Sequence, residues 1–285
     1  MHKNIKRPFG NHGRIYLSLT TLVVILLWLS SLFNTNWQQY IYETKNLGYI
    51  EFNLSLWGFS IKSRCNSPRY RYDYSKTSNK TKSSLSHINN LGLEDFVCSK
   101  LNYFNGRTFG EAASFVCSLN KYQFPNAKNA CYNFRMLNIG SLVMIAGIIG
   151  CTLCVFFGFI TFIMAYKTLS IKLTYAYIAL FGCSNLIAII TLPIYYVNAG
   201  GSWIAINSFF SVVHFGYPEF TYKSPSASEI QFFWGYSFAI LAFLTSILLP
   251  LFGCYFASLT ADYHDEIIKK LDEEERMIKH YNGLR

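Results

Sequence analysis

The chain has 285 residues, of which 52% are hydrophobic and only 14% are charged. Soluble domains typically carry about 25% charged residues, so this composition excludes an ordinary soluble protein. The 25 Lys and Arg outnumber the 15 Asp and Glu. Most of this basic excess falls in one segment, and it does not identify a nucleic-acid-binding protein.

All charged residues lie outside four apolar stretches, at residues 15–42, 136–166, 173–218 and 230–261. An α-helix of about 20 apolar residues crosses the hydrocarbon layer of a bilayer. The sequence therefore predicts an all-α membrane protein, a four-helix transmembrane bundle. Its expected spans are residues 15–33, 137–166, 173–197 and 232–259.

The first apolar stretch has one alternative interpretation, because a secretory signal peptide also has a basic start and an apolar core. The apolar core here is longer than the usual length of about 7–15 residues. Residues 33–36 read Phe-Asn-Thr-Asn and offer no clear small-x-small cleavage site. We therefore expect residues 15–33 to remain in the protein as a span.

The short connection at residues 167–172 sets the expected orientation. It contains two lysines, and short basic connections stay in the cytoplasm. Residues 1–14 and 260–285 are then cytoplasmic, and residues 34–136 and 198–231 lie outside. The first outer segment carries 13 Lys and Arg and 6 Asp and Glu, but long segments cross the membrane largely regardless of charge. We expect a multi-pass membrane protein with both termini in the cytoplasm.

The first outer segment is expected to contain a small extracellular antiparallel β-sheet. Apolar and polar residues alternate over residues 50–57, which is typical of a half-buried strand. Residues 37–42 are predicted as an earlier strand, paired with it through a turn at residues 45–48. Residues 67–90 are dense in Ser, Lys, Asn and Tyr and predict an exposed insertion.

Four cysteines lie in this outer segment, at Cys65, Cys98, Cys117 and Cys131. An even number of cysteines in an oxidising compartment predicts disulfides, here two, with three alternative connectivities. Their spacing contains no Cys-x-x-Cys pair, so a metal site is disfavoured. Cys254, near the inner end of the fourth span, is a candidate for palmitoylation.

Two N-glycosylation sequons stand in the outer segment, at Asn53 and Asn79. Asn79 lies in the polar insertion, where we expect it to carry glycan. Asn53 lies within the second predicted strand, so we expect it to be the weaker acceptor.

Several residues together form the pattern of a known family. Trp37 follows the first span, Leu56-Trp57 and the cysteines Cys65 and Cys98 come next, and Arg135 precedes the second span. The fourth span opens with Gly235-Tyr236-Ser237-Phe238. This pattern resembles the claudin superfamily of claudins, peripheral myelin proteins, calcium-channel gamma subunits and nematode Clc-like proteins.

The sequence departs from that family pattern in three ways. Ser55 stands where the family has Gly before Leu-Trp. The intervals from Trp57 to Cys65 and from Cys65 to Cys98 are longer than in the family, and Cys117 and Cys131 are additional. Some motif residues also have ordinary interpretations: Trp37 and Trp57 as aromatics of the membrane interface, and Arg135 as a snorkelling cation.

The resemblance implies a protein of the plasma membrane that functions in cell–cell contact, adhesion or junction organisation, through a disulfide-tied outer loop. The expected partner is a second copy or another membrane protein, in the same or an apposed membrane. The alternative is an auxiliary subunit that modulates an ion channel or receptor, as gamma subunits do.

Several kinds of chemistry are disfavoured by the sequence. No Asp, Glu, Lys, Arg or His lies deep in a predicted span, which disfavours coupled transport. There is no Gly-rich phosphate loop, and Cys151-x-x-Cys154 falls within a span. We therefore expect no enzymatic activity, no cofactor, no metal and no nucleic-acid partner.

The tail, residues 260–285, has an apolar helical face with two interpretations. It predicts either a solvated helix that extends the fourth span or a docking helix for a cytoplasmic partner. The residues of this face are Ile267, Ile268, Leu271 and Ile278.

Overall fold

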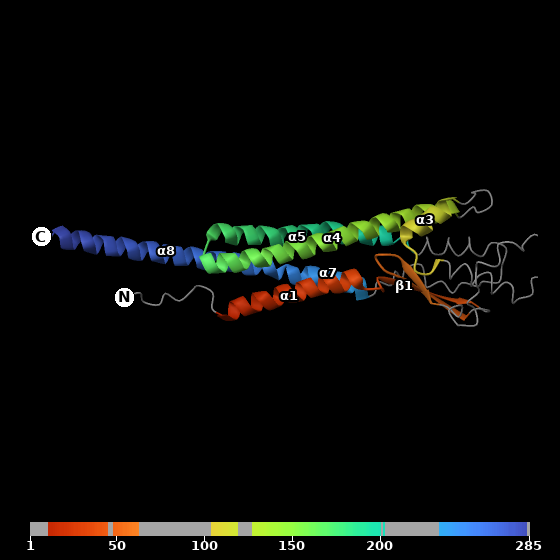
Figure 1. Cartoon of the computed structure of the whole chain (residues 1–285), viewed down its shortest axis with the longest axis horizontal. Coiled ribbons are helices and arrows are strands. Elements are labelled where there is room, and N and C mark those ends of the chain that lie inside the picture. Colours follow the sequence, from red (N-terminus) through yellow and green to blue (C-terminus); the bar gives the residue numbers. More distant parts are fainter. Residues whose placement is uncertain are drawn as a thin grey trace, which may run out of the picture. The chain divides into compact units, whose positions relative to one another are not determined.

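The structure is a computed structural model that describes residues 11–44, 48–62, 104–118, 127–200, 202 and 234–283. Figure 1 shows the elements in chain order. They are α1 (Asn11–Phe33), β1 (Gln38–Thr44), β2 (Gly48–Leu54), β3 (Phe59–Lys62), α3 (Phe109–Ser118), α4 (Ala127–Thr168), α5 (Ile171–Ala199), α7 (Trp234–Ser246) and α8 (Leu248–Gly283).

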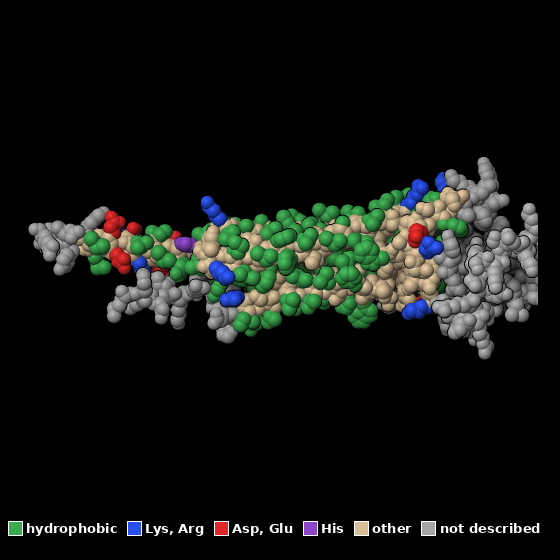
Figure 2. Space-filling model, viewed as in Figure 1, with side chains coloured by type: hydrophobic (Ala, Val, Ile, Leu, Met, Phe, Trp, Pro, Cys, Tyr) green, Lys and Arg blue, Asp and Glu red, His purple; other side chains and the backbone are tan. Residues whose placement is uncertain are grey.

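Four helical segments are long and apolar enough to cross a membrane, as the sequence predicts. They are Gly13–Phe33, Ala127–Thr168, Ile171–Ala199 and Trp234–Ile278. Hydrophobic side chains cover most of the visible surface of these helices (Figure 2). On α1, for example, Leu19, Leu22 and Leu26 are exposed. Exposed apolar surface of this extent is typical of contact with lipid or with another protein.

Two helices are longer than the apolar stretches within them. α4 begins at Ala127 rather than at the predicted 137, because Lys128 and Arg135 end the apolar stretch without breaking the helix. α8 continues to Gly283, so the tail is a helical extension of the fourth apolar segment. Ile268, Leu271 and other apolar residues of the tail are exposed.

The chain divides into two compact units. The first, here called the helical unit, consists of Met1–Leu29, Gly147–Ile190 and Ala239–Arg285. The second, here called the sheet unit, consists of Ser30–Ala146 and Thr191–Phe238.

Aromatic rings fill the core of the helical unit. The Phe162 ring meets Tyr177 at a centroid distance of 5.6 Å and Phe256 at 5.5 Å, both edge-on. Gly158 lets Phe181 approach α4, since a Cβ at Gly158 would lie 2.9 Å from its Cε1 atom. Small residues of this kind allow neighbouring helices of membrane proteins to pack closely.

A proline interrupts the last helix of the helical unit. α7 ends at Ser246, and α8 begins at Leu248. Pro250 has no N–H, so the carbonyl of Ser246 lacks its usual helical donor four residues ahead. The side-chain amide of Asn185 on α5 donates to this carbonyl at 3.4 Å, and the Ser246 hydroxyl contacts Asn185 Oδ1. Asn185 therefore satisfies the backbone group that the proline leaves unpaired.

We expect Asn185→Leu to destabilise the protein by about 1–2 kcal/mol, because the freed carbonyl then stays unpaired. The matched background is Pro250→Ala, which returns an N–H to Ser246. In the Pro250→Ala background, Asn185→Leu should lower the free energy of unfolding by clearly less than in the wild type. Thermal unfolding of the purified protein in detergent measures both effects, and equal losses in the two backgrounds would contradict the assignment.

The sheet unit contains the predicted antiparallel sheet, in the order β1-β2-β3. β1 and β2 form a hairpin in which Thr44 pairs with Gly48 at the turn and Gln38 with Leu54 at the open end. Ile50, Phe52 and Leu54 are buried, as the alternation predicts. The sheet and its first hairpin are therefore confirmed.

The second strand ends earlier than predicted, at Leu54 rather than Trp57. The Ser55 hydroxyl accepts hydrogen bonds from the backbone N–H groups of Trp57 and Gly58, each at 3.1 Å, and turns the chain. The chain then returns as β3, which was not predicted. Phe59 of β3 places its ring 6.1 Å from that of Phe109 on α3.

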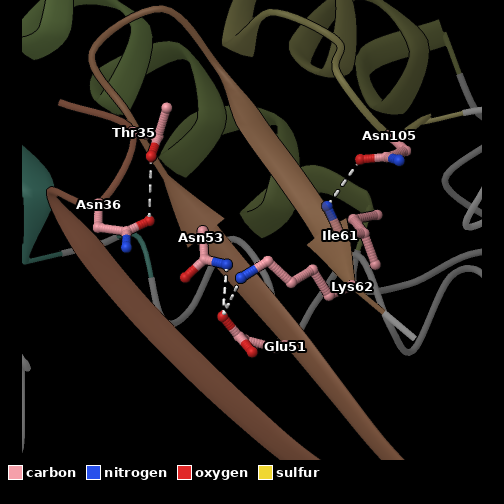
Figure 3. Close-up of polar contacts among 7 residues, drawn as sticks. All are labelled: Thr35, Asn36, Glu51, Asn53, Ile61, Lys62 and Asn105. Atoms are coloured by element: carbon pink, nitrogen blue, oxygen red, sulfur yellow. Dashed lines mark hydrogen bonds and ion pairs between the residues drawn. The ribbon is translucent and has the colours of Figure 1, made fainter. Parts of the chain in front are cut away.

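The outer edge of β3 is covered by residues 105–107. Gly106 N donates to Phe59 O at 3.0 Å, and Phe59 N donates to Arg107 O at 3.2 Å. The Asn105 side chain accepts from Ile61 N at 2.8 Å, as a further strand would (Figure 3). Gly106 adopts φ +79°, a conformation that glycine tolerates best.

α3 begins with a capping box. Glu111 N donates to Thr108 Oγ1 at 3.2 Å, and Thr108 N donates to Glu111 Oε2 at 2.9 Å. This reciprocal pair satisfies two donors at the start of the helix. The backbone and side-chain donors of Thr108, together with Arg107, hold the pKa of the exposed Glu111 carboxyl below its ordinary value.

Candidate functional site

Trp37 belongs to the sheet unit and lies between the end of α1 and the start of β1. Its side chain is fully buried. The indole N–H donates to Ser31 O on α1 at 2.9 Å, and the backbone N–H donates to Leu54 O on β2 at 2.7 Å. This residue therefore fixes the hairpin to the helix that precedes it. We call it, with Ser31, Gly235, Tyr195 and Tyr236, the Trp37 junction.

Gly235 forms the other side of the Trp37 junction. Its N–H donates to Asn36 O at 3.0 Å, and its carbonyl accepts from Ser31 Oγ at 2.8 Å. The glycine surface lies directly against the indole, since a Cβ at Gly235 would lie 2.5 Å from Trp37 Nε1 and 2.8 Å from Cγ. Only glycine leaves room for the indole here.

Two tyrosines complete the Trp37 junction. The Trp37 ring meets Tyr195 of α5 edge-on at 4.9 Å and Tyr236 of α7 at 6.1 Å. Tyr195 and Tyr236 stack on one another at 6.0 Å. Edge-on aromatic pairs contribute about 0.5–1.5 kcal/mol each beyond area burial. α1, the sheet, α5 and α7 therefore converge on one indole.

A buried polar cluster continues from β1. Tyr40 Oη and Ser202 Oγ are 2.5 Å apart, Ser202 Oγ donates to Gln38 Oε1 at 2.7 Å, and Gln38 Nε2 donates to Ala199 O at 3.4 Å. Burial raises the pKa of Tyr40 to about 12, although the hydrogen bond to Ser202 partly opposes the shift. The phenol therefore stays protonated and serves as a structural tie.

The second motif tryptophan lies differently from the first. Trp57 is 51% exposed, and its indole N–H donates to Leu32 O at 3.1 Å. Leu56 beside it is buried. Trp37 is thus a core residue rather than an interface aromatic, whereas the exposed ring of Trp57 agrees with either interpretation.

Glu51 anchors a polar group on the sheet surface. It accepts from Asn53 Nδ2 at 2.6 Å and from Lys62 Nζ at 3.2 Å (Figure 3). In the same view Thr35 contacts Asn36, which leads into β1. The Asn53 amide foremost holds the pKa of the Glu51 carboxyl below its ordinary value; burial opposes this shift, and Lys62 and Gln39 add to it.

The motif residues do not all meet. Trp37, Gly235 and Tyr236 come together, and Leu56 and Trp57 lie in the adjoining turn. Arg135 on α4 and Ser237 on α7 are exposed. Cys65, Cys98 and Asn79 lie outside the described residues.

The described cysteines separate into two groups. Cys117 at the end of α3 and Cys131 on α4 form a disulfide, as predicted for two of the four cysteines of residues 34–136. The cysteines of the spans are free, and Cys254 is exposed on α8. Within the described ranges, no three His, Cys, Asp or Glu side chains are grouped as metal ligands.

Several functional residues escaped the sequence analysis. The polar cluster of Tyr40, Gln38 and Ser202 joins positions far apart in the chain, and no local pattern marks it. Thr108 and Glu111, in contrast, have the spacing of a capping box, which would have predicted the start of α3.

Comparisons with models of known protein families, with curated proteins and with solved structures found no match for this chain.

We expect Gly235→Ala to destabilise the protein by about 1–3 kcal/mol, because the added methyl group overlaps the Trp37 indole. Gly182→Ala is the matched control on another helix, since a Cβ at Gly182 meets nothing within 4 Å. The control should be neutral or slightly stabilising, as alanine favours helix. Thermal unfolding in detergent checks this, and equal behaviour of the two variants would contradict the packing.

We expect Asn79→Gln, and not Asn53→Gln, to abolish a glycan-dependent mobility shift of the protein. Asn53 is only 2% exposed, and its amide nitrogen, which a glycan would modify, donates to Glu51. A glycan on that atom is incompatible with the folded sheet. Gel mobility with and without glycosidase checks this. A shift that depends on Asn53 would contradict the strand assignment.

Proposed function

We propose that this chain is a claudin-like, four-span protein of the plasma membrane that acts in cell–cell contact. In this proposal both termini lie in the cytoplasm, and the sheet with α3 lies outside the cell. The outer face meets a second copy or another membrane protein in the apposed membrane. The four apolar helices and the disulfide support this arrangement.

The observation that carries the proposal is the Trp37 junction. Trp37, Gly235 and Tyr236 were singled out by a family resemblance, although they are far apart in the sequence. In the structure these residues contact one another, and the sheet is fastened there to three helices. A sheet held in this way is suited to being presented in a fixed orientation to a neighbouring protein.

One exposed face of α4 is the candidate contact surface for this function. Lys128, Tyr132 and Arg135 are spaced by four and three residues, so they lie on one side of the helix. All three side chains are exposed, and Tyr132 is 59% exposed. Tyrosine and arginine are enriched in protein interfaces. The disulfide from Cys131 to Cys117 holds this part of α4 against α3.

The test uses cells that form no contacts of their own. Expressing cells are mixed with cells that lack the protein, and a fluorescent tag on the chain is imaged at both kinds of boundary. Enrichment between two expressing cells supports contact through a second copy. The variant Tyr132→Ala/Arg135→Glu should lower this enrichment at equal surface level, whereas Ser237→Ala should not.

The outcome that would overturn contact formation is an even distribution of the wild-type protein over the cell surface. Proximity labelling in native cells then separates the alternatives. Enrichment of a single ion channel or receptor among labelled proteins, with no accumulation at contacts, would favour an auxiliary subunit instead.

A further inference from the structure

Three basic side chains gather at one end of the helical unit. Arg14 belongs to α1, Lys167 to the last turn of α4 and Lys172 to the first turn of α5. All three are exposed. Arg14 lies over the ring of Tyr166, with its Cζ atom 5.5 Å from the ring centroid. Arg14 therefore lies against the end of α4, whose last turn carries Lys167.

The aromatic contact leaves the arginine able to bind an anion. A cation over an aromatic face is attracted by the ring, which fixes the guanidinium in place. Its N–H groups point outward in the guanidinium plane and suit two oxygens of a phosphate group. Tyr166 itself is buried, so the ring is a fixed support.

Three other described bases of the chain, unlike these, have acidic partners. Lys62 pairs with Glu51, Arg107 with Glu111 and Lys270 with Glu266. Within the described ranges, Arg14, Lys167 and Lys172 form no ion pair. Residues 1–14 and 167–172 contain no Asp or Glu, and residues 1–14 add Lys3, Lys6 and Arg7. The local positive charge is therefore not neutralised by its own segments.

The connection between α4 and α5 has a defined shape. Leu169 has φ +50°, and its carbonyl lies 2.8 Å from Nε2 of His264 on α8. This contact ties the connection that carries both lysines to a neighbouring helix. Lys167 and Lys172 are thus held at the two ends of a short, fixed hairpin.

We propose that Arg14, Lys167 and Lys172 form a binding surface for the headgroups of anionic phospholipids in the cytoplasmic leaflet. The inference rests on the membrane placement of the proposed function, which puts this end of the helices at the cytoplasmic surface. Basic clusters at that position attract acidic lipids, and each base raises lipid affinity about fivefold. Three bases next to an apolar helix surface suit a phospholipid, because the bases can bind its headgroup phosphate while the helix surface contacts its acyl chain.

The test reconstitutes the full chain in nanodiscs of phosphatidylcholine with 0–30% phosphatidylserine. Native mass spectrometry counts the lipids that stay bound, and a labelled lipid measures the preference. The wild type should prefer phosphatidylserine about tenfold or more, and the preference should fall as salt is raised. The variant Arg14→Gln/Lys167→Gln/Lys172→Gln should lose it, and Lys128→Gln/Arg135→Gln should keep it.

Several outcomes would overturn the lipid surface. These are an equal affinity of the wild type for both lipids, a preference retained in the triple variant, or the same loss in the control. Displacement of phosphatidylserine by millimolar inorganic phosphate would assign the surface to a free anion. If the triple variant keeps the lipid preference but no longer binds an acidic cytoplasmic protein, the basic surface is a binding site for that protein instead. Equal gel-filtration profiles show that the variants are folded.

The nanodisc experiment is independent of cell contact, because a nanodisc contains a single bilayer and no apposed membrane. If the wild type shows no lipid preference but is enriched at cell contacts, this inference alone is overturned. Lost enrichment with an intact preference would overturn the proposed function alone.

Discussion

Trp37→Ala is expected to destabilise the protein by about 3–5 kcal/mol, the cost of emptying a buried tryptophan site. The substitution removes the edge-on contacts to Tyr195 and Tyr236 and the hydrogen bond to Ser31 O. It also leaves the Ser31 carbonyl without that donor. We expect low surface expression and a lower midpoint of thermal unfolding.

The matched control is the other motif tryptophan. Trp57 is half exposed, and its side chain donates one hydrogen bond, to Leu32 O. Trp57→Ala should therefore cost about 0.5–1.5 kcal/mol, the net value of one hydrogen bond. Surface biotinylation and thermal unfolding in detergent measure both variants. A loss for Trp57→Ala as large as for Trp37→Ala would contradict the different roles assigned to the two residues.

A conservative variant separates packing from hydrogen bonding at Trp37. Trp37→Phe keeps an aromatic ring against Gly235 but lacks the indole N–H. It should lose less stability than Trp37→Ala, and Gly235→Ala should be less harmful in its presence because the smaller ring leaves room. Additive effects of the Trp37 and Gly235 substitutions would show that the two residues do not interact.

The four long apolar helices and the first hairpin could be predicted from the sequence because each has a local signal. A long apolar stretch predicts a span, and the alternation of Ile50, Phe52 and Leu54 predicts a strand with one buried face. The end of β2 was predicted too late because Leu56 continues the alternation. Its buried side chain belongs to a turn that the Ser55 hydroxyl makes.

The Trp37 junction could be predicted only in part. A family resemblance selected Trp37, Gly235 and Tyr236, but no property of the sequence shows that Gly235 faces the indole. Tyr195 was not selected, because one tyrosine in an apolar span has no distinguishing pattern. Asn185 was missed for a related reason, since its role depends on Pro250 of another helix. Membership of the claudin superfamily stays a prediction.

The disulfide between Cys117 and Cys131 is expected to stabilise the protein by about 3 kcal/mol. It closes a loop with a sequence separation of 14, and the loss of chain entropy in the unfolded state gives about this value for a loop of that length. Cys117→Ser should therefore lower the unfolding midpoint and delivery to the cell surface. Cys183→Ser, which replaces an exposed free thiol, is the control and should change neither.

The observed bond also selects among the three possible connectivities. With Cys117 joined to Cys131, we expect the second predicted disulfide to join Cys65 to Cys98. That pair would close a longer loop, so Cys65→Ser should be at least as harmful as Cys117→Ser. Mass mapping of non-reduced peptides should find both bonds, and a peptide that links Cys65 to Cys117 would contradict this connectivity.

Single and double substitutions separate the two ways in which losing this bond does harm. A single Cys117→Ser leaves Cys131 as a free thiol that can exchange with Cys65 or Cys98. The double variant Cys117→Ser/Cys131→Ser loses the same loop constraint but leaves no free thiol in the outer segment. If exchange dominates, the double variant should reach the surface better than either single variant. If loop closure dominates, all three should be equally impaired, because α3 and α4 are then untied in each of them.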